Sequence, residues 1–308
     1  MKDTASGIVG GAELQAQAEL ARRSSSGISD YLALTKPRLN VLVVVSAAVG
    51  YYLGRPGGAD VEAMTQAVAG TALVAAGAAV LNQVAERDTD ALMRRTRLRP
   101  LPDGRVGSGD ARMFGMALSS GGLTILAARV NWLAAALALA TLAVYLIVYT
   151  PLKRRTPLAT LVGAVPGALP ALIGWTAAHG SIAPGGAALF AIVFLWQIPH
   201  FMAIAWMYRD DYATAGFPML PVIDPEGRRA GRQAVTYATA LVPVSLTPAL
   251  AGLSGSWYSV TAMVLGAALL WLAMRFAATR SDDSARRLFL GSITYLPLLW
   301  AAMILNHR

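Results

Sequence analysis

Cysteine is absent from the 308 residues of this chain, so disulfides, thiol nucleophiles and thiolate metal sites are excluded. Charge is also scarce: charged residues make up 14% of the sequence, whereas a soluble domain carries about 25%. Apolar residues reach 56%. This composition excludes an ordinary soluble core. It predicts an all-α polytopic membrane protein whose main surroundings are the lipid bilayer.

Nine apolar segments approach the length of about 20 residues that a helix needs to cross a bilayer. The first is short, and the others are close to that length. We therefore predict nine transmembrane helices, at residues 39–54, 62–86, 111–128, 131–149, 157–176, 184–208, 232–252, 255–277 and 285–305. Residues 1–30, by contrast, are polar and rich in serine, glycine and alanine. We predict a disordered cytoplasmic tail there and one transmembrane domain over residues 31–308.

The net charge of +9 would suggest nucleic-acid binding in a soluble chain. Here membrane topology explains it, and we predict no nucleic-acid partner. Of the 26 lysines and arginines, all but Arg55, Arg129 and Arg308 fall on one side of the nine-span arrangement. Positively charged loops remain in the cytoplasm. The N-terminus and the long loops are therefore predicted to be cytoplasmic, and the odd number of spans puts the C-terminus outside.

A row of polar side chains stands at the end of the second span. Asn82, Glu86 and Asp90, and then Arg94, are spaced four residues apart, which keeps all four along one helix face with a drift of roughly 40° per step. Such groups are costly near lipid unless they pair or bind a ligand. An amide and two carboxylates are ligands that Mg²⁺ accepts, and Mg²⁺ in turn holds phosphate groups. We predict a catalytic metal site here; the alternative is a solvated, charged loop boundary.

Cationic residues flank this row. Arg94 and Arg99 follow it; bare Mg²⁺ would repel them, whereas an anionic ligand would attract them. At the end of the fourth span, Lys153 and Arg154 belong to a run of three cations that closely follows Tyr149. We predict that these residues bind a phosphate-bearing substrate. The alternative for the cations is a role as topology signals only.

The sixth span and the loop after it carry further candidates. His200 lies roughly 12 Å inside the predicted cytoplasmic end of that span, and an ionisable residue within the membrane is often functional. Asp211 would complete the metal site as part of a two-metal clamp, or would simply bound the loop. Trp196, Tyr208 and Tyr212 flank these residues, and we predict that they contact the substrate.

Lys36 and Asn40 stand at the start of the first span, on either side of Pro37. Proline is common at the first position of a helix, so the simplest interpretation is a charged anchor at the membrane boundary. The alternative places Lys36 on an anionic substrate and Asn40 within the substrate cavity.

Five motifs in a fixed order resemble one known family. Asn82-x-x-x-Glu86-x-x-x-Asp90 leads into RTRLRPLP, and the later motifs are YTPLKRRTP from Tyr149, GAVPGALPALIGW from Gly163, WQIPHF from Trp196 and DDYATAGFPMLPV from Asp210. They are similar to motifs of the UbiA-type intramembrane prenyltransferases, and specifically of their protohaem IX farnesyltransferase branch. The resemblance covers about residues 30–305.

The resemblance implies nine transmembrane helices around a central cavity open to the cytoplasmic side, in the plasma membrane of a bacterium. It also implies Mg²⁺-dependent transfer of a farnesyl group from farnesyl diphosphate to a vinyl group of haem b, giving haem O for terminal oxidases. Haem-pathway or oxidase-assembly proteins would be further partners. Asn82, Glu86 and Asp90 fall on the metal–diphosphate motif of the family, and Lys153 and Arg154 on its basic stretch.

Two departures from the wider superfamily leave questions open. Glu86 stands where aspartate is usual, which preserves a carboxylate. The second acidic motif of the superfamily pairs aspartates four residues apart, but Ala215 follows Asp211 at that spacing. The second metal's ligands therefore stay open between Asp210, Asp211 and the tyrosines at 208 and 212. His200 would contact a haem propionate, ligate the haem iron or stabilise positive charge.

Two other functions compete with this interpretation. One is prenyl transfer to a different acceptor, such as an aromatic acid, a quinone precursor or a chlorophyllide. The other is secondary transport through intramembrane carboxylates. Transporters place their ion sites near the middle of the membrane, whereas the acidic and basic residues here cluster at one face, which favours an enzyme.

Overall fold

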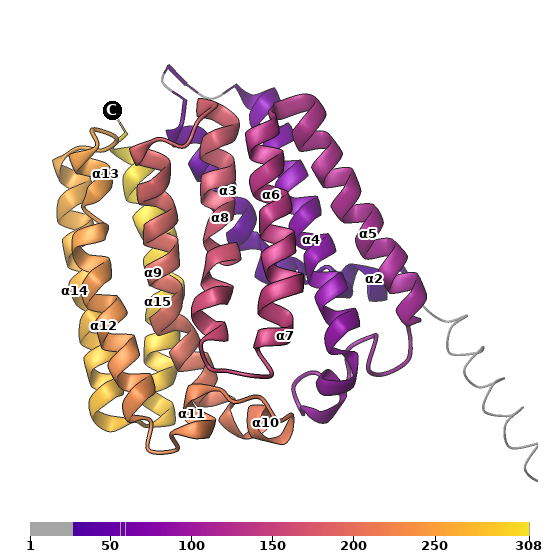
Figure 1. Ribbon diagram of the computed structural model, residues 1–308. Coiled ribbons are helices and arrows are strands. Elements are labelled where there is room, and N and C mark those ends of the chain that lie inside the picture. The colour runs from indigo at the N-terminus through magenta and orange to yellow at the C-terminus, as the bar shows by residue number, and fades with distance from the viewer. Residues whose placement is uncertain (1–26, 56, 59, 308) are drawn as a thin grey trace, which may run out of the picture.

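The structure, a computed structural model, describes residues 27–55, 57–58 and 60–307. Over these residues the chain is a bundle of helices that run side by side (Figure 1), with one isolated extended pairing between Ser254 and His307. The all-α prediction is therefore confirmed. The helices are α2 (Ile28–Leu34), α3 (Pro37–Leu53), α4 (Val61–Leu92), α5 (Ser108–Ile125), η1 (Leu126–Val130), α6 (Trp132–Ala143), η2 (Val144–Tyr149), α7 (Thr150–Leu152), α8 (Ala159–His179), α9 (Pro184–Met207), α10 (Arg209–Thr214), α11 (Leu220–Ile223), α12 (Arg228–Val244), α13 (Thr247–Leu250), α14 (Ser256–Thr279) and α15 (Asp282–Leu305).

The long helices form two packed groups. In the first, α3 and α6 pack on α8, and α4 packs on α5 and α3. In the second, α9, α12, α14 and α15 pack on one another, and contacts between α8 and α9 join the two groups. Figure 1 shows the second group, with α12, α14 and α15 in orange and yellow, at one side of the bundle. The largest buried cluster includes Phe276 and Trp300 and extends to Ala168 of α8.

Glycines set the distance between α3 and α8. A Cβ atom on Gly174 would lie 1.9 Å from the carbonyl oxygen of Ala47, and one on Gly50 would lie 2.1 Å from that of Ala171. Both neighbours are backbone atoms that cannot move aside independently of the helix. Only glycine therefore lets these two helices approach so closely, as small residues do in membrane bundles generally.

Seven helical segments are long and apolar enough to cross a membrane, among the residues that the structure describes. They correspond to seven of the nine predicted spans. The first predicted span lies on α3, which is bent by 54° from α2 and passes the same test only together with it. The predicted span 232–252 is interrupted, because α12 ends at Val244 and α13 begins at Thr247. The number nine therefore stays a prediction.

Helix α4 continues beyond its predicted end at residue 86, and its polar end remains helical. It begins after Asp60, whose side chain accepts a hydrogen bond from the backbone N–H of Ala63 at 3.1 Å, as N-cap residues do. It then runs as one helix to Leu92, where the extended backbone of Met93 ends it, so Arg94 lies beyond the helix and not on the predicted face. This continuity holds residues 82, 86 and 90 on one helix face.

Part of the predicted tail is ordered. Residues 1–26 lie outside the described residues, but Ile28 begins α2. Asp30 of this helix forms an ion pair with Arg105, and Tyr31 packs edge-on against Phe114. These contacts come from residues far along the chain, so the polar composition of the tail gave no sign of them. Residues 28–30 of the predicted tail therefore belong to a helix that packs on the bundle, and the domain boundary at residue 31 stays a prediction.

Candidate active site

Asn82, Glu86 and Asp90 are buried together at the end of α4. Only 4%, 4% and 1% of their respective surfaces are exposed. The amide Nδ2 of Asn82 donates a hydrogen bond to Glu86 Oε2 at 3.0 Å. Carboxylates buried to this degree are stable only with charged or hydrogen-bonding partners, and neighbouring segments supply both.

Lys153 provides the cation beside Glu86. Its Nζ atom donates to Glu86 Oε1 at 3.1 Å and lies 3.3 Å from Oε2. The same ammonium lies 4.6 Å from the centre of the Phe217 ring, a cation–π contact. The Thr150 hydroxyl lies 2.8 Å from Asn82 Oδ1 and 2.8 Å from the backbone oxygen of Tyr145, and its one hydrogen is shared between these two acceptors. The short helix α7 and the residue after it therefore close one side of the polar row.

Arg99 provides the cation beside Asp90. Its Nη1 atom donates to Asp90 Oδ2 at 2.8 Å. The loop after α4 folds back into this position because the Thr96 hydroxyl donates to the backbone oxygen of Asp90 at 2.7 Å. Each carboxylate of the row thus has its own cationic partner, and the two partners come from different parts of the chain.

Lys36 lies in the link between α2 and α3, and its pKa depends on the same charged side chains. Burial, and then the Arg99 guanidinium, lower the pKa of Lys36 to about 8, while the carboxylates of Asp90 and Glu86 act in the opposite direction. Asn40 lies in the first turn of α3, and its place in the substrate cavity stays a prediction. Its Nδ2 atom donates to the backbone oxygen of Thr35 at 2.7 Å, which fixes the turn between the two helices.

Tyr149 and Tyr145 present a stacked pair of rings next to the row. Their ring centres lie 5.4 Å apart and their planes are 16° from parallel. Both belong to η2, a π-helical segment of the kind that often occurs at functional sites. Gly163 makes room for this arrangement, because a Cβ atom there would lie 2.6 Å from the Tyr149 ring. The stacked pair leads directly into Thr150, which contacts Asn82.

A second cluster joins the loop after α4 to α10. The Arg95 guanidinium lies 4.7 Å from the centre of the Tyr208 ring, and its Nη2 atom donates to the hydroxyl of Tyr212 at 3.1 Å. Tyr212 in turn packs with Met93 and Phe217. Because Phe217 also lies under Lys153, this cluster covers the polar row from the side of α10 and α11.

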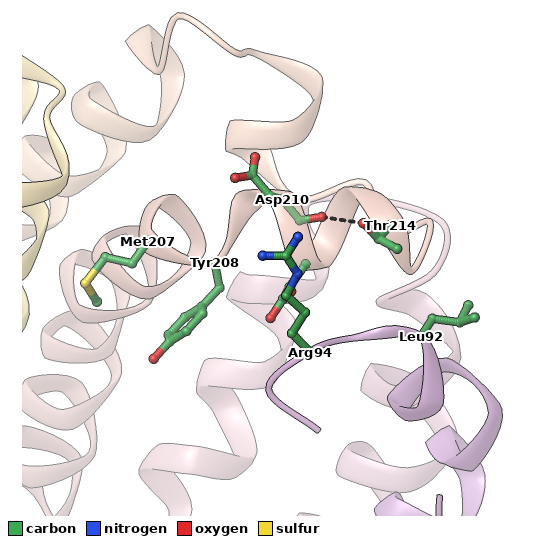
Figure 2. Close-up of a pocket in the computed structure, with 7 residues that line it drawn as sticks. Leu92, Arg94, Met207, Tyr208, Asp210 and Thr214 are labelled. Atoms are coloured by element: carbon green, nitrogen blue, oxygen red, sulfur yellow. Dashed lines mark hydrogen bonds between the residues drawn. The ribbon is translucent and has the colours of Figure 1, made fainter. Parts of the chain in front are cut away.

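Asp211 lies in a separate pocket of about 380 Å³ between the end of α4 and the junction of α9 and α10. The pocket is lined by Leu92, Arg94, Met207, Tyr208, Asp210, Asp211 and Thr214. Figure 2 shows Arg94 extending from the α4 side towards α10, where the Thr214 hydroxyl donates to the backbone oxygen of Asp210.

The pocket includes none of the three residues of the α4 row. Moreover, the described part of the chain contains no group of three or more His, Cys, Asp or Glu side chains that could hold a metal ion. The structure therefore does not gather Asp211 with Glu86 and Asp90, as the predicted four-residue metal site requires.

His200 and Trp196 form a third cluster, between α9 and α15. The His200 ring stacks on Trp196 and on Phe289, with ring centres 5.2 and 5.1 Å apart. Its Nδ1 atom lies 2.8 Å from Ser292 Oγ. The Ser292 hydroxyl hydrogen is already donated to the backbone oxygen of Phe289 at 2.6 Å. This arrangement favours the His200 tautomer that carries its hydrogen on Nδ1 and has a lone pair on Nε2.

Trp196 is a buried anchor of the same cluster, since its Nε1–H donates to the backbone oxygen of Ser292 at 2.7 Å. Arg154, in contrast, lies at the edge of the candidate site. Its Nη2 atom donates to the Thr89 hydroxyl at 3.3 Å, on a residue of α4 just outside the polar row. Trp196 is thus buried and Arg154 lies at the edge of the candidate site, although both were predicted to contact substrate.

Several residues of these clusters were not among the predicted site residues. Thr150 and Arg95 lie within recognised motifs, and their positions there were the available signals. Phe217 also lies within a recognised motif, the run that begins at Asp210. Ser292 carried no such signal, because its role depends on a contact with His200, which is distant in sequence.

The profile of the UbiA prenyltransferase family matches residues 43–301. The chain belongs to this family. A protein of Solibacter usitatus named protoheme IX farnesyltransferase is 47% identical over 287 residues, covering 90% of this chain and 98% of that protein. One of the same name from Koribacter versatilis is 44% identical over 293 residues, covering 92% and 94% respectively.

A solved UbiA homologue from Archaeoglobus fulgidus, bound to GPP and Mg²⁺, has the same fold. Its TM-score is 0.63 at 18% identity, with 89% of this chain and 99% of that chain covered. Membership of the UbiA family confirms the resemblance read from the motifs. Together with the apolar helices, it makes this chain a multi-pass integral membrane prenyltransferase, which overturns the transporter alternative.

Replacing Thr150 by valine should lower the rate of prenyl transfer by about tenfold, because the change removes one hydrogen bond that orients Asn82 while keeping the shape of the side chain. Thr141→Val is the matched control, since the Thr141 hydroxyl bonds only to the backbone oxygen of Leu137 on its own helix. Rates measured on both purified variants check this. Equal rates for the two would contradict a role of Thr150 in the site.

Proposed function

We propose that this protein transfers the farnesyl group of farnesyl diphosphate to a vinyl group of haem b, which gives haem O. The names of the relatives that are 47% and 44% identical support the choice of substrates. The observation that carries the chemistry is the buried row of Asn82, Glu86 and Asp90 with Lys153 and Arg99 paired to its carboxylates.

The residues of the row fit a magnesium ion. All three offer hard oxygen atoms, and Mg²⁺ is usually bound by one or two carboxylates together with substrate phosphates and water. Asn82, Glu86 and Asp90 would hold it. Bound there, Mg²⁺ would neutralise the diphosphate and make it a better leaving group. We assign no second ion to Asp211, because that side chain lines a different pocket.

The cations of the site would bind the diphosphate itself. Lys153 and Arg99 neutralise Glu86 and Asp90 in this structure. Once the metal takes the carboxylate of Glu86, the Lys153 ammonium would move to a phosphate oxygen, and Arg99 has further N–H donors that suit phosphate. Burial and neighbouring cations lower the pKa of Lys36 to about 8. A bound diphosphate would raise that pKa and favour the protonated, positively charged form of the side chain. Arg94, across the adjacent pocket, would attract the same charge from outside.

The farnesyl group would react next to the aromatic rings. Loss of diphosphate breaks the allylic C–O bond, and the positive charge left on the farnesyl carbon is stabilised by the faces of Tyr149 and Tyr145. A C–C bond then forms to the haem vinyl group. Water adds to the resulting carbocation and loses a proton to solvent, which leaves a hydroxyethylfarnesyl group. The cluster of Arg95, Tyr208 and Tyr212 would exclude water until that last step.

His200 would position the haem. With its hydrogen on Nδ1 and bonded to Ser292, the imidazole offers Nε2 as a neutral acceptor. Such a nitrogen suits ligation of the haem iron better than contact with an anionic propionate. Stacking on Trp196 and Phe289 fixes the plane of the ring. Ser292 is thus a positioning residue that selects the tautomer, as partners of metal-binding histidines generally do.

The orientation in the membrane follows from the charges. We place the N-terminus and the ends that carry the active site in the cytoplasm of a bacterium, and the C-terminus outside, because Lys and Arg gather in the loops on the active-site side. Farnesyl diphosphate would then enter from the cytoplasm with its chain in the bilayer. Burial of that chain contributes roughly 0.8 kcal/mol per CH₂ group, which favours a reaction at the membrane.

Incubation of membranes that contain the protein with haem b, Mg²⁺ and labelled farnesyl diphosphate should yield one labelled haem, separable by chromatography. Glu86→Gln and Asp90→Asn should each lower this yield by about 100-fold, because the buried site loses a charge that acts on the leaving group. The matched controls are Glu62→Gln and Asp88→Asn, which change exposed carboxylates on the same helix.

These two controls should keep the wild-type yield. Label that appears in a quinone or an aromatic acid instead of haem would contradict the acceptor. Near-normal yields for both site variants would contradict a role of Glu86 and Asp90 in the reaction.

His200→Ala should raise the KM for haem by about tenfold, a typical effect of a lost metal ligand or its partner, while leaving the affinity for farnesyl diphosphate unchanged. Ser292→Ala should show a weaker effect in the same direction, and His179→Ala, at an exposed position, should show none. Initial rates at varied haem, with direct binding of labelled farnesyl diphosphate, separate these cases. If the His200 variant no longer binds farnesyl diphosphate, the assignment of His200 to the haem is contradicted.

A further inference from the structure

A groove of about 110 Å³ lies where α14 ends and α15 begins, apart from the clusters described above. Trp271 and Arg275 of α14 line one wall, and Asp283 and Arg287 of α15 line the other. Ser284 also lines the groove and is buried, with 7% of its surface exposed. The groove therefore presents two arginines to whatever occupies it.

The two arginines are held in place but keep unused donors. The Arg275 guanidinium lies 5.4 Å from the centre of the Trp271 ring, and no carboxylate of the described residues forms an ion pair with it. Arg287 pairs with Asp283 through Nε at 3.0 Å. The two cations and one carboxylate leave a positive charge at the groove. Guanidinium N–H groups in this state suit the oxygen atoms of a phosphate group.

Below the groove, both helices present an apolar stripe to the outside of the bundle. On α14, exposed Val260 and Val264 stand at helical spacing from Trp271 and Arg275. On α15, exposed Leu290 continues the face of Arg287. Leu290 lies about one helical turn from Arg287, and Val264 about three turns from Arg275. Both helices are long and apolar enough to span a membrane.

We propose that this groove binds an anionic phospholipid, with the phosphate on Arg275 and Arg287 and the acyl chains along the apolar stripes. The charge of the groove matches the headgroup, and the continuous apolar face below it matches the chains. A soluble phosphate would use only the arginines and leave the stripes without a partner. Trp271 stands near the end of α14, and tryptophan side chains gather at such ends, between headgroups and hydrocarbon.

The test compares the full-length protein with two double variants of equal charge. Arg275→Gln with Arg287→Gln removes both guanidinium groups of the groove. The control, Arg280→Gln with Arg286→Gln, removes two arginines of the same connection that do not line it. Native mass spectrometry of each protein, titrated with phosphatidylglycerol and with phosphatidylcholine of identical chains, gives the affinity for each lipid. A parallel arm adds inorganic phosphate.

We expect the wild type and the control to prefer phosphatidylglycerol. The groove variant should bind it at least tenfold more weakly, since each arginine near a membrane surface contributes about fivefold. Its phosphatidylcholine binding and its melting temperature in phosphatidylcholine should match those of the control, which shows that it is folded. Equal losses in both variants would overturn the proposal in favour of general surface charge. Phosphate that displaces phosphatidylglycerol at millimolar concentration would overturn it in favour of a soluble anion.

Discussion

The ion pair between Glu86 and Lys153 is the interaction on which the candidate active site depends. Glu86 is buried beside Asn82, and the ammonium lies 3.1 Å from its carboxylate. Removing one partner of such a pair costs about 3–5 kcal/mol, whereas a single neutral hydrogen bond contributes about 1 kcal/mol. The pair therefore decides whether the polar end of α4 can stay inside the bundle. A metal–diphosphate complex could replace it by exchanging partners, with the carboxylate on the metal and the ammonium on phosphate, so that no buried charge is left alone at any stage.

The rest of the fold delivers the partners of that pair to one place. The unbroken length of α4 carries the row inward. The π-helical turns of η2 lead into Thr150, which holds Asn82, and then into Lys153. The loop after α4 returns Arg99 to Asp90. Phe217, from beyond α10, lies under the ammonium. The partners of Asn82, Glu86 and Asp90 therefore come from several separate segments. Movement of any one segment would change which charges are paired at the end of α4.

Local periodicity made some of this site predictable and left the rest hidden. The four-residue spacing of Asn82, Glu86 and Asp90 needs only one helix, so the sequence was sufficient to place them on one face. The motifs likewise identified Lys153 and Arg99 before their contacts were known. Ser292 beside His200, the interruption of the seventh predicted span near Val244, and the separate pocket of Asp211 all depend on how distant segments pack. A pattern of apolar and charged residues along one chain does not contain that information.

The central claim is that Lys153 changes its partner when substrate binds. An experimental structure of the protein with Mg²⁺ and a non-reactive analogue of farnesyl diphosphate tests this directly. The account predicts that Asn82, Glu86 and Asp90 surround the metal and that Lys153 Nζ contacts a phosphate oxygen in place of Glu86. A structure in which the 3.1 Å contact between Lys153 and Glu86 persists, with the diphosphate in the pocket beside Asp211 or elsewhere, would contradict it.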